Sequence, residues 1–176
     1  MEKGLAKNIE VIRFGFDHNY WTYSSEEPKE IAIGYAGRIV PWKRLKELSE
    51  VAIELNYNVQ VMGKIDKQSY WDSIPKDNLK FNYWDCDDED RINFYRNITI
   101  FVQNSIEGYE SGTMPMLEAM ACGVPVITTP TGQASFEENL FKDHYNCLLI
   151  PFEGKEELKN AIKELMENKE LRDKLS

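Results

Sequence analysis

Short apolar runs and amphipathic stretches alternate along this chain from residue 31 onward. The first run, 31–36, is almost entirely apolar and ends at Gly37, which is the pattern of a buried strand. The stretch 43–56 has apolar residues at intervals of three and four, which predicts an amphipathic helix. The same reading predicts further strands at 58–62, 79–83, 98–103, 124–128 and 148–150.

Helical patterns fill the segments between these strands. The helix predicted at 114–122 has Pro115 near its start and ends before Gly123, the order of proline and glycine that helices favour. The other predicted helices are a weak one at 67–73, one at 88–97 with acidic residues near its start, and a long one at 154–168. Such alternation builds βαβ units, so we expect a Rossmann-like α/β fold, a doubly wound parallel sheet with helices on both faces.

The pattern divides the chain at about residue 30. Residues 31–176 carry the alternating elements and are enough for one domain with a well-buried core. Residues 1–30 do not follow the pattern. They could form an edge strand and turn, or a linker from a preceding domain, and the sequence leaves both open.

Composition and charge narrow the class of protein. Hydrophobic residues make up 42% of the chain and charged residues 29%, as in soluble globular proteins. No apolar run is long enough to cross a bilayer, and the N-terminus has no apolar signal-peptide core, so we expect a cytoplasmic protein. The formal net charge of -9 argues against a broad nucleic-acid-binding surface, although a few local cations suffice for a small anionic ligand.

The cysteines and histidines are too scattered to suggest a metal site. Cys86, Cys122 and Cys147 are far apart and form no CxxC motif, so we expect buried reduced thiols. His18 and His144 are isolated, and each is expected to be a surface or structural residue. We therefore expect neither a metal nor another cofactor.

Ligands of such sheets bind beyond the carboxyl ends of the strands, so the loops that leave strands are informative. The first of them, 37–44, carries three cations beside a predicted helix start, where free backbone N–H groups attract anions. Arg38 could grip phosphate oxygens with its planar guanidinium, and Lys43 adds a compact charge next to Gly37. The alternative is a solvated basic turn that neutralises nearby carboxylates.

The loop 104–114 runs from a strand into a helix and is bracketed by Glu110 and Glu118. Gly112 lets the backbone approach a ligand, and the helix start at Met114 is a second anion site. An ionised carboxylate can accept two hydrogen bonds from the vicinal hydroxyls of a ribose or hexose. Each carboxylate alone has an ordinary structural explanation. Together they predict a site for a ligand with sugars and phosphate.

Two other loops could also line the ligand site. Trp84 and Cys86 follow a strand and could edge a pocket for a nucleobase, whereas the acids around them could equally begin the next helix. The segment 128–133, rich in threonine and glycine, either lines the same site or is only a turn.

Glu110 and Glu118 have seven residues between them and are followed by the sequence AMACGVPVI at 119–127. This pattern resembles the EX7E signature of retaining glycosyltransferases of family GT4. The first loop, with its glycine, arginine and lysine, resembles the G-R-x-x-x-x-K phosphate loop of that family. Further similar segments, in family order, are 14–17, Gly63, 146–151 and 154–165.

The resemblance implies that this chain is one half of a GT-B fold, the C-terminal domain that binds the nucleotide-sugar donor. It implies that Arg38 and Lys43 contact the donor diphosphate and stabilise the leaving group, without a bound metal. It also implies that Glu118 binds the ribose and that Glu110 contacts the transferred sugar. The implied activity is hexosyl transfer with retention, from a nucleoside-diphosphate sugar to a carbohydrate or lipid-linked acceptor.

The sequence departs from the family pattern at this loop. Thr113 stands where the family has its second glycine, which bears on how closely the backbone approaches the diphosphate. Glu107 is a rival for the first carboxylate, but ten residues separate it from Glu118, so we prefer Glu110.

The length of the chain leaves room for only one of the two domains that a GT-B enzyme needs. We therefore expect an excised fragment rather than a natural single-domain protein. Such a fragment would be inactive without its N-terminal acceptor domain, through which the whole enzyme could associate with a membrane. The alternatives are a non-catalytic nucleotide-sugar-binding module, or another GT-B activity such as an epimerase or a phosphorylase.

Overall fold

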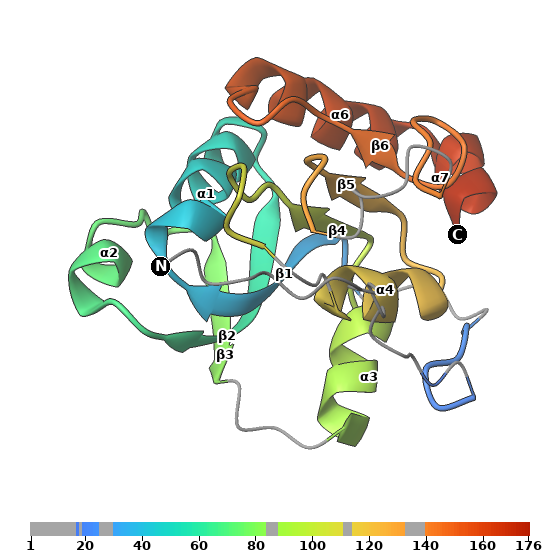
Figure 1. The fold of residues 1–176 in the computed structure, drawn as a ribbon, viewed down its shortest axis with the longest axis horizontal. Helices are drawn as coiled ribbons and strands as arrows, with labels where there is room; N and C mark the ends of the chain where they lie inside the picture. The colour runs from blue at the N-terminus through green and yellow to red at the C-terminus, as the bar shows by residue number, and fades with distance from the viewer. Residues whose placement is uncertain (1–16, 18, 25–29, 84–87, 111–113, 133–139) are drawn as a thin grey trace, which may run out of the picture.

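A computed structural model describes residues 17, 19–24, 30–83, 88–110, 114–132 and 140–176. Six strands form one sheet in the order β3-β2-β1-β4-β5-β6, and neighbouring strands run parallel (Figure 1). The strands are β1 (Ala32–Ile39), β2 (Asn58–Ile65), β3 (Leu79–Tyr83), β4 (Ile100–Gln103), β5 (Val126–Thr128) and β6 (Leu148–Leu149). The order reverses between β1 and β4, which makes this junction the switch point of the sheet.

Helices cover both faces of this sheet. They are α1 (Leu45–Glu54), α2 (Gln68–Asp72), α3 (Asp88–Arg96), α4 (Met114–Ala121), α6 (Lys155–Glu167) and α7 (Lys169–Leu175), with a 3-10 turn at Pro41–Lys43. Figure 1 shows α1 and α6 on one side of the sheet and α3 and α4 on the other. The doubly wound α/β fold expected from the sequence is therefore confirmed.

The sheet is buried on both faces, which explains why its strands appear in the sequence as continuous apolar runs. In β4, Ile100 and Val102 pack into the core beneath α1 and α6, whereas Phe101 packs into the core beneath α3 and α4. The second core also includes Trp21, which lies outside the repeating pattern. Of residues 1–30, the described ones form no strand, and the segment 1–16 lies outside the described residues.

The sequence prediction was wrong about the start of the first helix. The helix α1 begins at Leu45 rather than at Lys43, because Pro41–Lys43 form a separate 3-10 turn. Arg44 joins the two with a left-handed backbone, at a φ of 51°. The strand before this turn is also longer than predicted and continues through Gly37 to Ile39. Lys43 therefore precedes the helix start instead of belonging to it.

The sequence reading also missed α7, which follows α6 after a single residue. The side chain of Asn168 caps this short helix by accepting a hydrogen bond from the backbone N–H of Leu171, at 3.0 Å. Leu175 at its other end is buried in the first core. A seven-residue helix gains its stability from such docking rather than from its own pattern.

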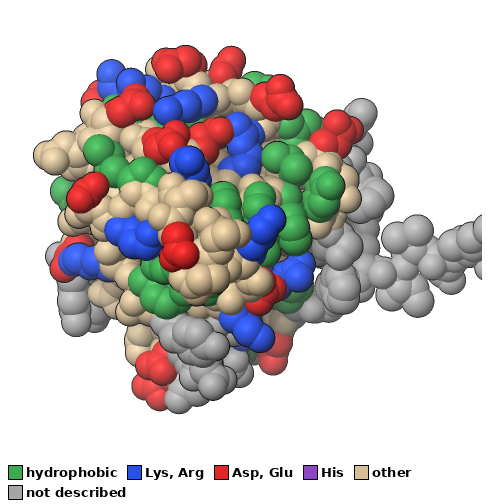
Figure 2. Space-filling view, turned by 90° about the vertical axis from the view of Figure 1, so that its left-hand side faces the viewer, with side chains coloured by type: hydrophobic (Ala, Val, Ile, Leu, Met, Phe, Trp, Pro, Cys, Tyr) green, Lys and Arg blue, Asp and Glu red, His purple; other side chains and the backbone are tan. Residues whose placement is uncertain are grey.

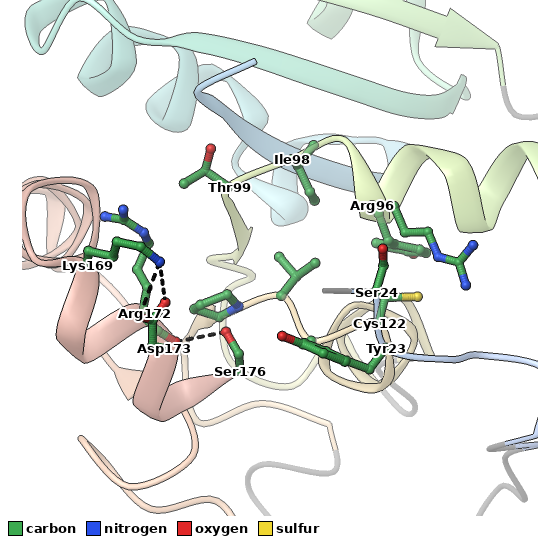
Figure 3. Close-up of a pocket in the computed structure, with 14 residues that line it drawn as sticks. Tyr23, Ser24, Arg96, Ile98, Thr99, Cys122, Lys169, Arg172, Asp173 and Ser176 are labelled. Atoms are coloured by element: carbon green, nitrogen blue, oxygen red, sulfur yellow. Dashed lines mark hydrogen bonds and ion pairs between the residues drawn. The ribbon is translucent and has the colours of Figure 1, made fainter. Parts of the chain in front are cut away.

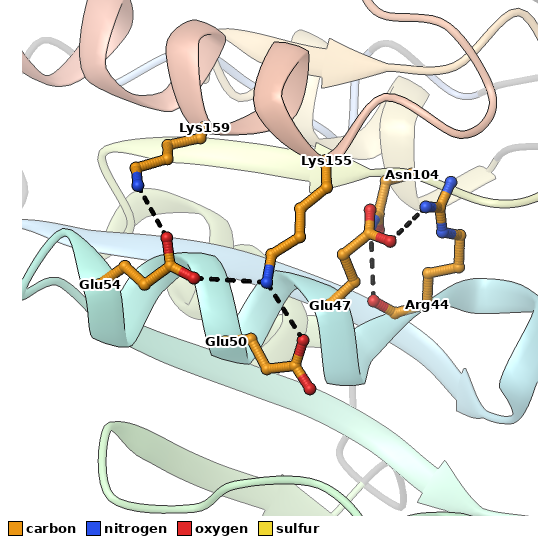
Figure 4. Close-up of polar contacts among 7 residues, drawn as sticks. All are labelled: Arg44, Glu47, Glu50, Glu54, Asn104, Lys155 and Lys159. Atoms are coloured by element: carbon orange, nitrogen blue, oxygen red, sulfur yellow. Dashed lines mark hydrogen bonds and ion pairs between the residues drawn. The ribbon is translucent and has the colours of Figure 1, made fainter.

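Ion pairs join α1 to α6 across the surface. Lys159 Nζ lies 2.7 Å from a Glu54 oxygen, and Lys155 Nζ lies 3.3 Å from Glu54 and 3.4 Å from Glu50 (Figure 4). On the face in Figure 2, Lys and Arg side chains are interspersed with Asp and Glu, so that face has no extended area of one charge. Exposed pairs of this kind contribute little to stability.

We predict that His144 titrates above its ordinary pKa of 6.5. The hydrogen bond with Asp143, at 2.9 Å from Nδ1, raises the pKa most, and Glu164 at 3.0 Å from Nε2 raises it further, although slight burial opposes them. A raised folded-state pKa means that this contribution to stability is complete below about pH 6.5 and is lost as the pH rises through the folded-state pKa. An NMR titration should give a midpoint above 6.5, and a lower midpoint in Glu164→Gln. A wild-type midpoint at or below 6.5 would contradict the prediction.

Candidate functional site

The candidate site lies at the carboxyl edge of the sheet, where the loops after β1 and β4 meet. The backbone N–H of Ile106 donates to the carbonyl of Trp42 at 2.9 Å. The side chain of Asn104 donates to the carbonyl of Arg44 at 3.4 Å (Figure 4). These two bonds join the loops at the switch point, where ligands of doubly wound sheets bind.

Lys43 and Glu110 form an ion pair between the two loops. Lys43 Nζ lies 2.8 Å from Glu110 Oε1, and the side chains are only 11% and 8% exposed. The hydroxyl of Ser105 donates to the same Glu110 oxygen at 3.1 Å. Among the described residues, Glu110 Oε2 accepts no hydrogen bond. The carboxylate is thus held in place by two groups and keeps one oxygen for another donor.

Gly37 makes room for Lys43 to reach this position. The glycine has a φ of 140°, and a Cβ there would lie 3.3 to 3.4 Å from the end of the Lys43 side chain. L-residues with a side chain rarely adopt this backbone conformation. The dihedral angle of this position therefore favours glycine, and a side chain there would also press on the end of the lysine.

Arg38 pairs with a different carboxylate. Its side chain is 59% exposed, and Nη1 lies 3.7 Å from an oxygen of Asp66. The guanidinium is 5.8 Å from the centre of the Trp42 ring. Within the described ranges, the Arg38 guanidinium is thus held only by an exposed carboxylate and a ring contact, and its charge remains accessible to a ligand.

Glu118 is buried between α3 and α4, at 2% exposure. One oxygen forms an ion pair with Arg91, and the other accepts a hydrogen bond from the Tyr95 hydroxyl at 2.7 Å. Burial raises the pKa of Tyr95 well above its ordinary value of 10, and the adjacent Glu118 carboxylate raises it further. Tyr95 therefore stays protonated and remains a donor to Glu118 at physiological pH.

The loop after β5 contacts the loop after β4. The hydroxyl of Thr129 donates to the carbonyl of Ser105 at 2.7 Å, and Thr129 is completely buried. Ser105 is the residue whose hydroxyl contacts Glu110. This contact links the loop after β5 to the loop that carries Glu110, and whether 128–133 lines the site stays a prediction.

The other predicted site residues have different outcomes. Met114 is the first residue of α4, as expected of a helix start. Trp84, Cys86, Gly112 and Thr113 lie outside the described residues, so their predicted roles stay predictions. The remaining two cysteines are free and buried, as expected, and burial raises the pKa of the Cys122 and Cys147 thiols to about 11.

Sequence reasoning did not identify several residues around this site. Arg91 and Tyr95 lie on the weakly patterned α3, and their spacing of four residues places them on one helix face. Ser105 was not selected as a site residue either. Trp42 and Tyr109 were passed over, although each is adjacent in sequence to a residue of the buried ion pair.

Two hollows of the described structure lie away from this site. One of about 100 Å³ lies at the opposite edge of the sheet, lined by Ile98, Thr99 and residues of α7 (Figure 3). The other, of about 720 Å³, is an open groove over β2, β3 and α3 that is lined by Gln60, Asn82 and Asn93. Neither contains the Lys43 loop or the Glu110 loop. The candidate site therefore rests on the chemistry of its residues.

Two features are absent from the described ranges. No three His, Cys, Asp or Glu side chains in these ranges are grouped as they would be around a metal ion. Within the same ranges, no helix has the length and apolar character needed to span a membrane.

The fold is similar to those of several known proteins. The C-terminal domain of a glycosyl transferase group 1 family protein from Francisella tularensis aligns at a TM-score of 0.73 and 22% identity, with 92% of each chain covered. Anabaena HepE in complex with UDP-glucose aligns at a TM-score of 0.81 and 20% identity, over 98% of this chain and 52% of its own. An uncharacterised glycosyltransferase of Methanocaldococcus jannaschii is 24% identical over 94% of this chain and 45% of its own length.

These similarities establish the fold, which is the Rossmann-like α/β fold of the C-terminal domains of GT-B glycosyltransferases. The chain spans about half the length of the archaeal relative and of HepE. In addition, the sequence profile of the family described as glycosyl transferases group 1 matches residues 22–176, which is most of the chain. This chain therefore belongs to the group 1 glycosyl transferase family.

Proposed function

We propose that this chain binds the nucleoside-diphosphate sugar donor of a retaining glycosyltransferase. Together with an N-terminal acceptor domain, it transfers a hexose to a carbohydrate or lipid-linked acceptor. The observation that carries the proposal is the buried Lys43–Glu110 pair at the switch point of the sheet. A largely buried ammonium group beside a fixed carboxylate is suited to a ligand that combines phosphate with sugar hydroxyls.

The two members of this pair have complementary roles in the proposal. Lys43 contacts the diphosphate and stabilises the charge that develops on the leaving nucleoside diphosphate. Glu110 Oε2 accepts a hydrogen bond from a hydroxyl of the transferred sugar, while Ser105 and Lys43 hold the other oxygen. The short distance between ammonium and carboxylate supports this assignment, because phosphate and sugar are adjacent in such a donor.

Arg38 supplies the second positive charge for the diphosphate. Its contact with Asp66 is long and exposed, so a phosphate can replace Asp66 at little cost. A planar guanidinium can then form two parallel hydrogen bonds to phosphate oxygens.

Glu118 is proposed to accept hydrogen bonds from the ribose hydroxyls. Arg91 and Tyr95 already contact its two oxygens, but a carboxylate has about four lone-pair sites and can accept further donors. In this arrangement the two residues of α3 fix the orientation of the carboxylate. HepE, whose structure contains UDP-glucose, makes a UDP-sugar the first donor to test.

A thermal-shift screen with UDP, GDP, ADP and their sugar conjugates tests the proposal. We expect one diphosphate to raise the melting temperature selectively, since a ligand at 100 times its Kd stabilises the native state by about 2.7 kcal/mol. The absence of a shift with every nucleotide would count against a donor site in this chain.

Calorimetry on Arg38→Ala tests the phosphate role separately. We expect a loss of about ten-fold in affinity for the selected diphosphate and almost none for its nucleoside, because only the diphosphate offers oxygens to a guanidinium. Lys163→Ala is the matched control, because it removes one positive charge from the exposed surface of α6. Equal losses for nucleoside and diphosphate would contradict a phosphate contact.

A further inference from the structure

Two aromatic rings stack on each other at the outer rim of the candidate site. Trp42 and Tyr109 have ring centres 5.4 Å apart and an angle of 27° between their planes. Trp42 comes from the loop after β1 and Tyr109 from the loop after β4. Tyr109 is 59% exposed, which makes it one of the few large apolar side chains of the described chain on the surface.

The stacked rings come from the same two loops as the ion pair and are adjacent to it in sequence. Lys43 and Glu110 pair at one position of the two loops, and their sequence neighbours Trp42 and Tyr109 pair at the adjacent position. The inner pair is nearly buried, whereas the outer pair reaches solvent. An aromatic surface therefore lies directly beside the proposed contact points of phosphate and sugar.

Packing of the fold does not account for these two rings. Neither Trp42 nor Tyr109 belongs to the two cores that cover the sheet. Nevertheless, the loops that carry the rings are joined, since the carbonyl of Trp42 accepts a backbone hydrogen bond from Ile106. Because the loops are already joined, little conformational entropy would be lost when a ligand binds to the rings.

Polar groups surround the aromatic pair. The Arg38 guanidinium lies 5.8 Å from the centre of the Trp42 ring, and Asp66 pairs with Arg38. Glu110 follows Tyr109 in the chain. Specific ligand sites typically combine an apolar surface with a few fixed polar groups, and Tyr and Trp provide such a surface with few torsions to immobilise.

We propose that Trp42 and Tyr109 form a platform for a pyranose ring. One face of a pyranose presents C–H groups, which suit the negative face of an aromatic ring, and its hydroxyl rim suits Arg38, Asp66 and Glu110. The ring belongs either to the sugar of the donor or to the saccharide acceptor. The inference extends the proposed function, because it takes the position of the sugar from the assignment of Glu110.

Binding measurements on this chain distinguish the two sources of the ring. The donor arm compares calorimetric affinities for UDP and UDP-glucose, or for whichever of the UDP, GDP and ADP pairs gives a thermal shift. The acceptor arm records saturation-transfer NMR signals from methyl α-D-glucopyranoside and maltose. We expect Tyr109→Ala to lower affinity about five-fold in one of these arms, and Tyr109→Phe, which keeps the ring, to have little effect.

A matched control separates the platform from any exposed tyrosine. Tyr145 is 67% exposed, and its ring centre lies 5.6 Å from the Lys142 ammonium group. It belongs to the segment between β5 and β6, and not to the loops after β1 and β4. We expect Tyr145→Ala to bind as the wild type does in both arms. Circular dichroism of each variant checks that the fold is retained.

The outcomes are distinct. A loss confined to UDP-glucose assigns the platform to the donor sugar, and a loss confined to the free saccharides assigns it to the acceptor. An equal loss for UDP and UDP-glucose would indicate stacking on the nucleobase and would overturn the inference, as would unchanged binding in both arms. If the wild type binds no nucleotide, the proposed function fails. In that case the saccharide signals alone test the inference, and the absence of these signals would overturn the inference.

Discussion

Glu118→Ala is expected to lower the free energy of unfolding by about 3 kcal/mol, measured by urea denaturation. The substitution removes the carboxylate that Arg91 and Tyr95 both contact between α3 and α4. Tyr95 is completely buried, so its hydroxyl would lose an acceptor that water cannot easily replace. The expected effect is therefore much larger than that of a surface carboxylate.

Two companion variants test this explanation. Glu118→Gln keeps an oxygen for the Tyr95 hydroxyl but loses the charge opposite Arg91, so an intermediate destabilisation is expected. Glu167→Ala removes an exposed acid from the end of α6 and should change stability by less than about 0.5 kcal/mol. If Glu118→Ala were as stable as Glu167→Ala, the contacts between α3 and α4 would not have the importance inferred here.

The stability effect also bears on how donor binding is measured. A loss of nucleotide affinity in Glu118→Ala could arise from a loosened α3 as well as from a lost ribose contact. Tyr95→Phe leaves the carboxylate and its pair with Arg91 in place but removes one of the two groups that orient it. Normal affinity in Tyr95→Phe, with weakened affinity in Glu118→Gln, would assign the contact to the carboxylate itself.

Lys43→Met is expected to affect both stability and donor binding. It leaves the Glu110 carboxylate, which is 8% exposed, without the cation that compensates its charge, at a cost of about 3 kcal/mol. Methionine keeps most of the aliphatic chain that passes Gly37, so packing changes little. The loss of a charged hydrogen bond should weaken diphosphate binding by about ten-fold or more.

The double variant Lys43→Met/Glu110→Gln separates these two effects. With both charges removed, much of the lost stability should return, because no unpaired buried charge remains. Diphosphate affinity should stay low, since the ammonium group is still absent. Urea denaturation and calorimetry with UDP measure the two quantities. Recovery of diphosphate binding in the double variant would exclude Lys43 from the phosphate site.

Most strands and helices were predictable because their signals are local. The apolar runs at β1 and β4 and the Pro-to-Gly order around α4 each lie within a few neighbouring residues. The start of α1 was not predictable in this way. A 3-10 turn at Pro41–Lys43 and the left-handed Arg44 depend on the adjacent loop, which holds the carbonyls of Trp42 and Arg44.

The same difference applies to the candidate site. Gly37, Lys43 and Glu110 could each be selected from the sequence, because loops that follow strands converge at one edge of a parallel sheet. Their pairing could not, since the contact joins loops that are far apart in the chain. The partners of Glu118 were also out of reach, because α3 has a weak pattern and its packing on α4 is a tertiary contact.

The sequence by itself therefore determined the fold class, the order of most elements and the loops that hold the candidate site residues. Local periodicity and the backbone requirements of glycine and proline are enough for these. Tertiary structure alone decided that Lys43 meets Glu110, that Glu118 joins α3 to α4, and that Trp42 stacks on Tyr109. Each of these contacts depends on distances between segments brought together by the sheet, which no local pattern encodes.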